Sequence, residues 1–183
     1  MTSWRLPLRL APPLATLLAL GACADAPVSR GNAEITQIRN VANWTPARCS
    51  PDPQQAREQQ LLLDEINRTR QSHGLGAVRY EPRLAAAAHE HACANARAGE
   101  ISHTGPGGTR PGHRALRAGY DYRIVAENLG LGFHGARQAM FYWMRSPGHR
   151  SNVLKPEVRD AALGLTLTKA GQRTWVLMLG KTR

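Results

Sequence analysis

Acidic residues are scarce in this sequence, and its basic residues never gather into a block. The chain has 183 residues, with 13 Asp and Glu against 24 Lys and Arg, which gives a formal net charge of +11. The basic residues are scattered, are mostly Arg, and are not interleaved with aromatic residues. Because nucleic-acid binding needs a clustered basic patch, the pattern argues against a nucleic-acid partner. The excess charge then indicates either contact with an anionic envelope surface or simply solubility.

A long apolar run is also lacking. Residues 10–22 are apolar, but they are too few to span a bilayer and are interrupted by two prolines. They follow Arg5 and Arg9, and this order is typical of an export signal. We therefore expect an exported protein without a transmembrane helix.

The apolar run ends in Leu-Gly-Ala-Cys, residues 20–23. This tetrapeptide resembles the bacterial lipobox, which implies that Cys23 becomes the lipid-bearing mature N-terminus and holds the protein to a membrane. An ordinary signal peptide cut near Ala22 is the alternative. Ala24 rather than Asp after the cysteine favours the outer membrane, facing the periplasm, by resemblance to other lipoproteins. The chain is predicted to divide into a signal peptide (1–22), a tether (23–52) and a globular domain (53–183).

Cysteine is rare, with three residues in the whole chain. If Cys23 carries lipid, Cys49 and Cys93 remain as an even number in an oxidising compartment, which favours a disulfide between them. Two free thiols are the alternative. His89 lies four residues before Cys93 on the same helical face, but packing or a disulfide explains Cys93 better than a nucleophilic role does.

Helical periodicity and turn signals predict four helices before a final hairpin. The helices are expected from about residue 50 to 72, from 81 to 98, from 111 to 119 and from 136 to 145. Residues 161–168 and 174–179 read as strands joined at Ala170-Gly171. After helix 136–145, the Ser-Pro-Gly at 146–148 is expected to form a turn. Helices followed by antiparallel strands predict an α+β fold, with a sheet between helical layers.

Three fragments each place one titratable residue beside small or apolar neighbours. They are Ser-His-Thr at 102–104, Ala-Glu-Asn-Leu at 126–129 and Trp-Met-Arg-Ser-Pro-Gly-His-Arg-Ser-Asn-Val-Leu at 143–154. No period relates them, as expected of a site assembled from separate loops. The Gly-rich segment at 105–108 allows its backbone to approach another part of the chain closely.

Together with Ala-Gly-Tyr and a closing strand, these motifs resemble the bacterial branch of the CAP superfamily (the cysteine-rich secretory protein, antigen 5 and pathogenesis-related group, or SCP domains). The likeness covers about residues 55–180. It implies a three-layer α-β-α sandwich with a central antiparallel sheet, and a cleft lined by two His and two acids. By position His103, Glu127 and His149 match three of the four. The fourth position, an acid in many bacterial members, is His113 here, and no acid lies between Glu100 and Asp121.

Two or three imidazoles and one carboxylate suit Zn²⁺ or another divalent cation. His103, His113, His149 and Glu127 are therefore the candidate ligands, with Glu127 as a general base in the alternative of a metal-dependent, protease-like hydrolase. The sequence has no His-Glu-x-x-His motif. Glu127 and His149 can instead be structural, holding their loops through hydrogen bonds, and a purely structural role is also open for His113.

The favoured hypothesis is a non-enzymatic, lipid-tethered binding module of the bacterial envelope, because no nucleophile accompanies the cluster. Its ligand would be a hydrophobic small molecule or lipid, a peptide or a cell-wall component. The alternatives are the hydrolase and a structural protein whose basic surface contacts anionic polymers. The family resemblance does not decide between them, since its members serve several functions.

Overall fold

The computed structural model describes residues 48–183, so the predicted signal peptide, the lipobox with Cys23 and most of the tether lie outside the described residues. The elements follow one another as α2 (Gln55–Ser72), β1 (Arg79–Tyr80), α3 (Pro82–Ala98), the 3₁₀ turn η1 (Pro106–Gly108), α4 (Pro111–Arg117), β2 (Tyr122–Leu131), α5 (Ala136–Arg145), α6 (Pro147–Val153), β3 (Asp160–Leu167) and β4 (Arg173–Thr182). Within this part of the chain, no helix is long and apolar enough to cross a membrane.

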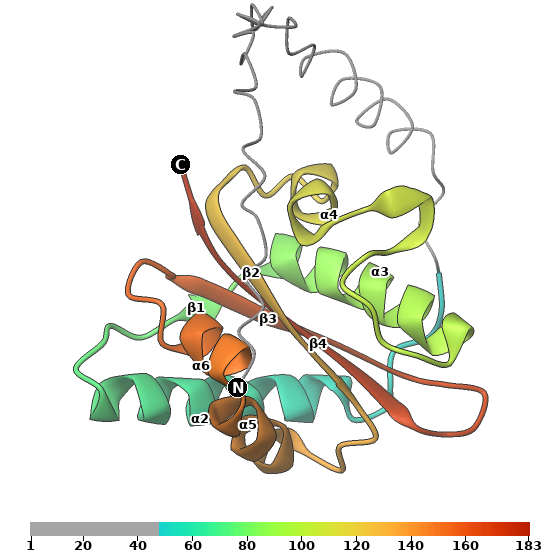
Figure 1. The fold of residues 1–183 in the computed structure, drawn as a ribbon, viewed down its shortest axis with the longest axis horizontal. Coiled ribbons are helices and arrows are strands. Elements are labelled where there is room, and N and C mark those ends of the chain that lie inside the picture. Colours follow the sequence, from blue (N-terminus) through green and yellow to red (C-terminus); the bar gives the residue numbers. More distant parts are fainter. Residues whose placement is uncertain (1–47) are drawn as a thin grey trace, which may run out of the picture.

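A four-stranded sheet in the order β1-β3-β4-β2 forms the middle layer. Helices α3 and α4 pack against one face, and α2, α5 and α6 cover the other (Figure 1). Strands β3 and β4 form the expected hairpin, and β2 pairs antiparallel with the outer side of β4. The α-β-α sandwich is thus confirmed. The sheet is mixed, because the two-residue β1 pairs parallel with β3.

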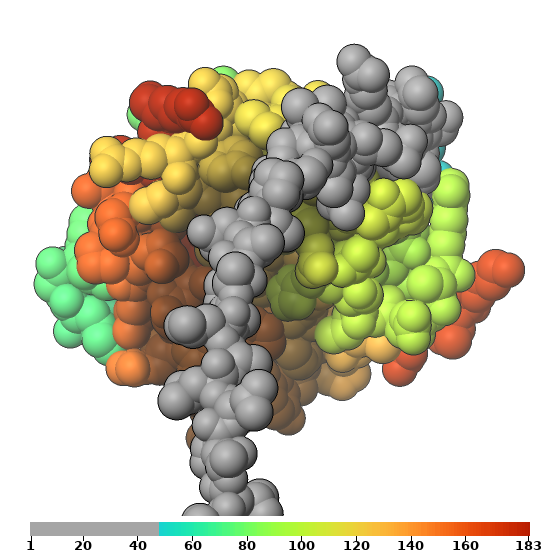
Figure 2. Space-filling view, turned by 45° about the horizontal axis from the view of Figure 1, so that its top comes forward, coloured from blue at the N-terminus to red at the C-terminus, as the bar shows by residue number. Residues whose placement is uncertain are grey.

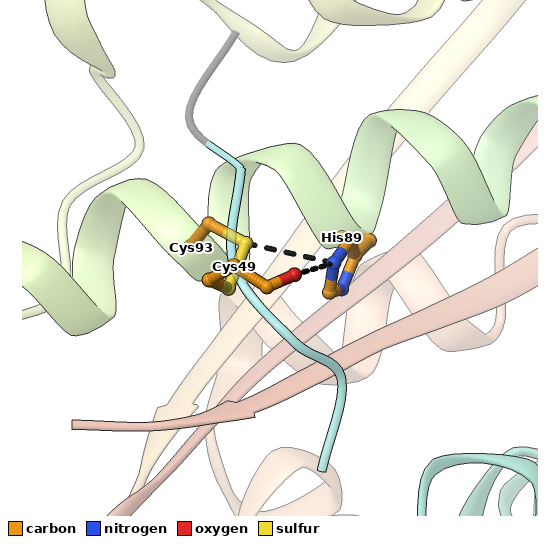
Figure 3. Close-up of side chains that lie close together, drawn as sticks. All are labelled: Cys49, His89 and Cys93. Atoms are coloured by element: carbon orange, nitrogen blue, oxygen red, sulfur yellow. Dashed lines mark hydrogen bonds between the residues drawn. A yellow bond between two sulfur atoms is a disulfide. The ribbon is translucent and has the colours of Figure 1, made fainter.

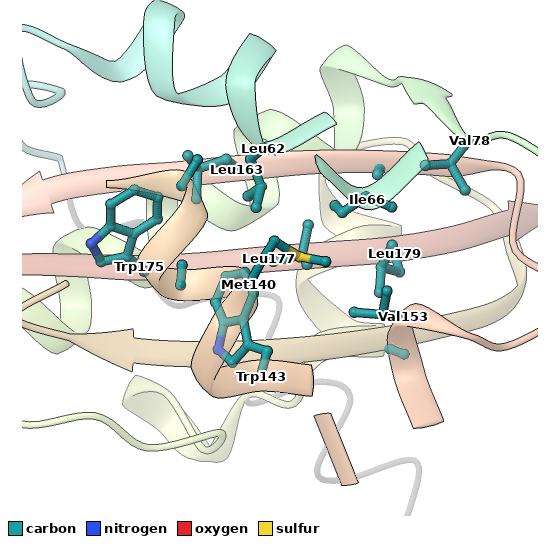
Figure 4. Close-up of a cluster of buried hydrophobic side chains, with 14 of the residues drawn as sticks. Leu62, Ile66, Val78, Met140, Trp143, Val153, Leu163, Trp175, Leu177 and Leu179 are labelled. Atoms are coloured by element: carbon teal, nitrogen blue, oxygen red, sulfur yellow. The ribbon is translucent and has the colours of Figure 1, made fainter. Parts of the chain in front are cut away.

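The two faces of the sheet have different cores. Beneath α2 and α5 lies a core of large side chains, among them Leu62, Ile66, Trp143 and Trp175 (Figure 4). Half of the buried residues on the α3 side are alanines, and three of them, Ala87, Ala88 and Ala92, lie on α3 itself. Helix α3 consequently approaches β3 so closely that a Cβ added at Gly164 would lie 2.3 Å from the carbonyl carbon of Ala88.

Helix α2 begins later than the sequence predicts, at Gln55 rather than near Ser50. The cause is Asp52, whose amide donates to the Leu165 carbonyl at 2.9 Å and whose carboxylate pairs with Arg173 at 3.0 Å. These bonds hold the segment before α2 against the β3–β4 hairpin.

The expected turn at residues 146–148 is in fact the start of a helix. Pro147 occupies the first turn of α6, where its missing N–H costs no hydrogen bond. Ser146 adopts an extended conformation and separates α5 from α6. The Ser-Pro-Gly sequence therefore redirects one helix into another, and the second carries His149.

The predicted disulfide between Cys49 and Cys93 is present, with a Cα–Cα distance of 5.6 Å. It joins the segment before α2 to α3. His89 lies one turn earlier on α3, and its Nε2 is 3.0 Å from the Cys49 carbonyl oxygen and 3.6 Å from Cys93 Sγ (Figure 3). The alternative of two free thiols is excluded, and so is a nucleophilic role for Cys93.

Candidate functional site

Glu127 is the centre of the candidate site, and it reaches this place from the middle of β2. Its neighbour Ala126 belongs to the core beneath α2 and α5, so alternation along the strand turns Glu127 toward α3 and α4. The residue is 4% exposed. A carboxylate this deeply buried needs charged or hydrogen-bonding partners, and they come from three different segments.

Both carboxylate oxygens of Glu127 are engaged. Arg114 Nη2 donates to Oε2 at 2.7 Å, and His103 Nδ1 donates to Oε1 at 2.8 Å. Burial by itself would raise the pKa of Glu127, but the His103 hydrogen bond and the Arg114 charge outweigh it and hold that pKa below its ordinary value. Glu127 is therefore an ionised acceptor.

Arg114 is a buried cation on α4 that stands in no local sequence motif. It is 1% exposed. Besides Glu127, its guanidinium donates to the carbonyls of Thr109 at 2.9 Å and His103 at 3.2 Å. It therefore holds the loop between α3 and α4 against β2. The clue in the sequence is indirect: a buried Glu needs a cationic partner, but only the structure shows that the partner is Arg114.

His91 on α3 also belongs to this network, and it too was missed. It is 1% exposed, its Nε2 donates to the Ser102 carbonyl at 2.7 Å, and the same atom lies 3.8 Å from Glu127 Oε1. Burial lowers the pKa of His91 to about 4, so the ring is neutral at pH 7. Gly105 approaches the other ring nitrogen so closely that a Cβ there would lie 3.3 Å from Nδ1. This is the close backbone approach that the Gly-rich segment predicted.

His103 is the part of the network that reaches solvent. Its side chain is 50% exposed, although Nδ1 is bound to the buried Glu127. Within residues 48–183, no hydrogen bond occupies its other nitrogen, Nε2. The carboxylate thus fixes the ring and leaves one imidazole nitrogen available at the surface.

His149 comes to the same place from α6. Its ring is half-buried, and its pKa is lowered first by burial and then by the charge of nearby His103. Asn128 on β2 donates to the His149 carbonyl at 3.0 Å, and Asn152 donates to the Asn128 side chain at 2.9 Å. These asparagines join β2 to α6. The three sequence fragments therefore converge, and Figure 2 shows the yellow α4 segment and the orange α6 segment on one face of the molecule.

His113 does not join this group. Its Nδ1 accepts a hydrogen bond from the Arg110 amide at 3.2 Å, which caps the start of α4. No hydrogen bond or ion pair links it to His103, Glu127 or His149 in the described part of the chain. His113 therefore caps its own helix, while the next residue, Arg114, is the one that contacts Glu127.

The donor set fits a divalent cation only in part. Among residues 48–183, the sole group of three or more His, Cys or acidic ligand atoms within 4.8 Å of one another is Cys49, His89 and Cys93. The two sulfurs of that group are bonded to each other and are not thiolate ligands. At the candidate site, Glu127 is a poor direct ligand because Arg114 neutralises it. The imidazoles of His103 and His149 fit a borderline ion such as Zn²⁺.

The sandwich fold and this site define the class of protein. The model of the cysteine-rich secretory protein family, or CAP, matches residues 63–179, and the chain belongs to that family. No curated protein matches the sequence well enough to count as a relative.

Several solved structures share the fold. An outer surface protein of Borrelia burgdorferi has a TM-score of 0.67 at 20% identity, over 74% of this chain and 100% of that one. An extracellular SCP-domain protein of Bacillus anthracis has a TM-score of 0.63 at 20% identity, over 74% of this chain and 45% of that one. A cysteine-rich secretory protein of Staphylococcus aureus has a TM-score of 0.55 at 19% identity, over 73% of this chain and 42% of that one. Identities this low establish the fold alone.

Proposed function

We propose that this protein is an exported, lipid-anchored and non-enzymatic binding module of the bacterial envelope. In this proposal Cys23 carries the lipid. The site formed by His103, Glu127 and His149 contributes to ligand binding and takes a divalent cation weakly. The surface or extracellular descriptions of two structural neighbours support the location, and the lipobox supports the anchor.

The observation that carries the non-enzymatic part is the state of Glu127. A general base must be free to take a proton, and its pKa should lie near the working pH. Glu127 has one oxygen on Arg114 and the other on His103, and its pKa is lowered. A carboxylate held in this way orients an imidazole and is poorly suited to activate water.

The same geometry supports the cation. A carboxylate that accepts from one nitrogen of a histidine fixes the ring and makes the other nitrogen a better ligand, as commonly seen behind metal-binding histidines. His103 is held in this manner by Glu127, and His149 lies beside it. These two rings would hold the ion, which would then offer open coordination positions to an acidic or carbonyl-bearing ligand. With only two protein ligands, we expect weak binding.

The test is a zinc titration by calorimetry on the chain from residue 23 onward, carrying Cys23→Ser so that no lipid is attached. We expect one ion per chain, with the heat lost in His103→Ala/His149→Ala. The matched control is His73→Ala/His134→Ala, which removes two exposed histidines outside the site and should bind as wild type.

His113→Ala distinguishes this proposal from a site with three histidines, because we expect it to bind zinc unchanged. A folded wild-type protein that takes up no zinc, or a His103/His149 double variant that still binds, would contradict the proposed cation site.

A further inference from the structure

A second feature of the surface lies on the far side of α6 from the network around Glu127. A groove of about 440 Å³ runs between the end of α5 and the segment that follows α6. Three cationic side chains line it, Arg145, Arg150 and Lys155, and its apolar lining includes Met144 and Leu154. No acidic residue lines this groove.

None of the three cations has an acidic partner within residues 48–183. The Arg145 guanidinium lies over the Phe141 ring, 4.7 Å from its centroid. Arg150 contacts His73 at 3.4 Å, and that ring is the acceptor because its other nitrogen donates to a carbonyl. The Lys155 side chain makes no hydrogen bond or ion pair in the described chain. Three other surface cations, Arg68, Arg79 and Arg137, each pair with a carboxylate.

A buried cation beneath the groove adds to this positive charge. Arg70 on α2 is fully buried and donates to four carbonyls, those of Gly76, Val153, Lys155 and Val158. Its hydrogen bonds are satisfied by neutral groups, so its charge is not compensated by a carboxylate. Burial and nearby Arg159 lower its pKa, yet an arginine stays charged at neutral pH. Four positive charges therefore act on one small groove.

Apolar surface continues from the groove along α5. Phe141 and Tyr142 are 54% and 50% exposed, and they are the largest exposed aromatic side chains next to Arg145. The Tyr142 ring stacks on Phe133 with centroids 5.4 Å apart, which holds it in place. Cations beside exposed aromatic rings suit the boundary between lipid headgroups and acyl chains.

We propose that the groove binds the anionic headgroup of a phospholipid, so that the α5–α6 surface lies against a negatively charged membrane. The phosphate would contact Arg145, Arg150 and Lys155, while Phe141 and Tyr142 enter the interface beside it. The proposal shares no groove residue with the cation site, and it does not depend on zinc binding. This membrane contact is also separate from lipid attachment at Cys23, because it is made by side chains of the folded domain.

Sedimentation with vesicles tests it. The chain from residue 23 with Cys23→Ser is mixed with vesicles that contain phosphatidylglycerol, or with vesicles of phosphatidylcholine alone. We expect binding to the anionic vesicles only, weakened by salt. Since each basic side chain near such a surface contributes about fivefold in partitioning, Arg145→Gln/Arg150→Gln/Lys155→Gln should bind about a hundredfold less well.

The matched control removes the same number of arginines and lysines elsewhere. Arg57, Arg123 and Lys169 are exposed and make no ion pair in the described structure, so Arg57→Gln/Arg123→Gln/Lys169→Gln should lose far less binding. Circular dichroism checks that both triple variants are folded. Equal losses of vesicle binding in the two triple variants would show that only the net charge matters. That result would contradict the proposed role of the groove.

Two further outcomes would also overturn the proposal. One is a groove triple variant that sediments like the wild type. The other is a protein that ignores anionic vesicles and instead binds a soluble polyanion such as dextran sulfate through the same three residues. In that case the partner would be a charged polymer and not a membrane. Protection of residues 141–156 from hydrogen exchange by anionic vesicles would support the proposed orientation.

Discussion

At the scale of single residues, the pair of Glu127 and Arg114 dominates the α3–α4 side of the sheet. Both side chains are about 1% exposed, and their contact is 2.7 Å. A buried ion pair adds little net stability over apolar packing, but removing one partner leaves an unpaired buried charge and costs roughly 3–5 kcal/mol. Each residue therefore constrains the other. The surface imidazole of His103 depends on both, because Arg114 keeps Glu127 ionised and Glu127 orients the ring.

His91 makes stability depend on pH. Its pKa is about 4 in the folded protein against an ordinary 6.5, because it is buried. Below pH 6.5 His91 is therefore protonated in the unfolded chain but remains neutral in the folded protein. The free energy of unfolding consequently falls as the pH drops toward 4. We expect His91 to contribute a loss on the order of 3 kcal/mol across that window.

Urea denaturation at pH 7, 5.5 and 4.5 measures this loss. His91→Gln keeps a donor for the Ser102 carbonyl but cannot be protonated, so its stability should depend less on pH than that of the wild type. Parallel curves for the two proteins would mean that His91 is not the responsible group. His149, whose pKa is also lowered, is present in both proteins, and His91 is not among the causes of its shift.

The sequence identified the site residues that carry a local motif. His103, Glu127 and His149 stand in recognisable fragments, and the structure brings these fragments together. Arg114 and His91 have no such signal. Their importance comes from the buried position of Glu127, which only the packing of α3 and α4 on β2 creates. His113 was singled out by alignment with a family pattern, whereas its side chain faces the start of its own helix.

At the scale of elements, helix α3 and strand β3 approach each other closely, backbone to backbone. This approach depends on alanine in the helix and on Gly164 in the strand. Interiors are packed too densely to absorb an added methyl group against rigid backbone. Helix α3 can therefore lie this close to β3 only because residue 164 is a glycine and has no Cβ.

Gly164→Ala should destabilise the protein by about 3 kcal/mol, at the upper end of the range for overpacked cores. Its Cβ would lie within 2.3 Å of two backbone atoms of Ala88. Gly148→Ala is the matched control, because nothing lies within 4 Å of its Cβ position and the residue is inside α6. It should be neutral or stabilise by up to about 1 kcal/mol. Chemical denaturation measures the free energy of unfolding of both variants. A Gly164→Ala protein as stable as the wild type would show that an added methyl group can be accommodated between β3 and α3.

Elements with a clear period were predictable, and those without one were not. Helix α5 has the predicted bounds, and β3 and β4 lie within a few residues of theirs. Strand β2 was missed because Glu127 and Asn128 interrupt its apolar pattern; both are buried and satisfied by partners elsewhere. Helix α6 was missed because Pro and Gly suggest a turn, although proline is well suited to the first turn of a helix.

At the scale of the whole molecule, the order of helices and strands was enough to predict the layered α+β architecture. The parallel pairing of β1 was not predictable, because a strand of two residues carries no pattern. The excess of positive charge could be counted in the sequence. Its concentration in a groove could not, because Arg70, Arg145 and Lys155 come together only through the packing of α2, α5 and α6.

The lipid anchor is a prediction about the whole protein, and Cys23 decides it. In a bacterial host, Cys23→Ser should abolish incorporation of labelled fatty acid, so that high salt then releases the protein from the membrane fraction. Cys49→Ser is the control, since Cys49 forms the disulfide with Cys93 and should not affect labelling. Fatty-acid labelling and membrane fractionation measure both effects. Unchanged labelling of Cys23→Ser would favour the ordinary signal peptide.

The disulfide has a mechanical consequence for a domain held at its N-terminal end. Cys49 and Cys93 are 44 residues apart, and the covalent bond between them bypasses everything in that interval. A pulling force applied ahead of Cys49 enters α3 directly. Helix α2 and strand β1 lie inside the closed loop and are outside the covalent path from Cys49 to α3. The tension is borne first by α3 and the sheet that it packs against, which leaves α2 seated on its core while the domain is under strain.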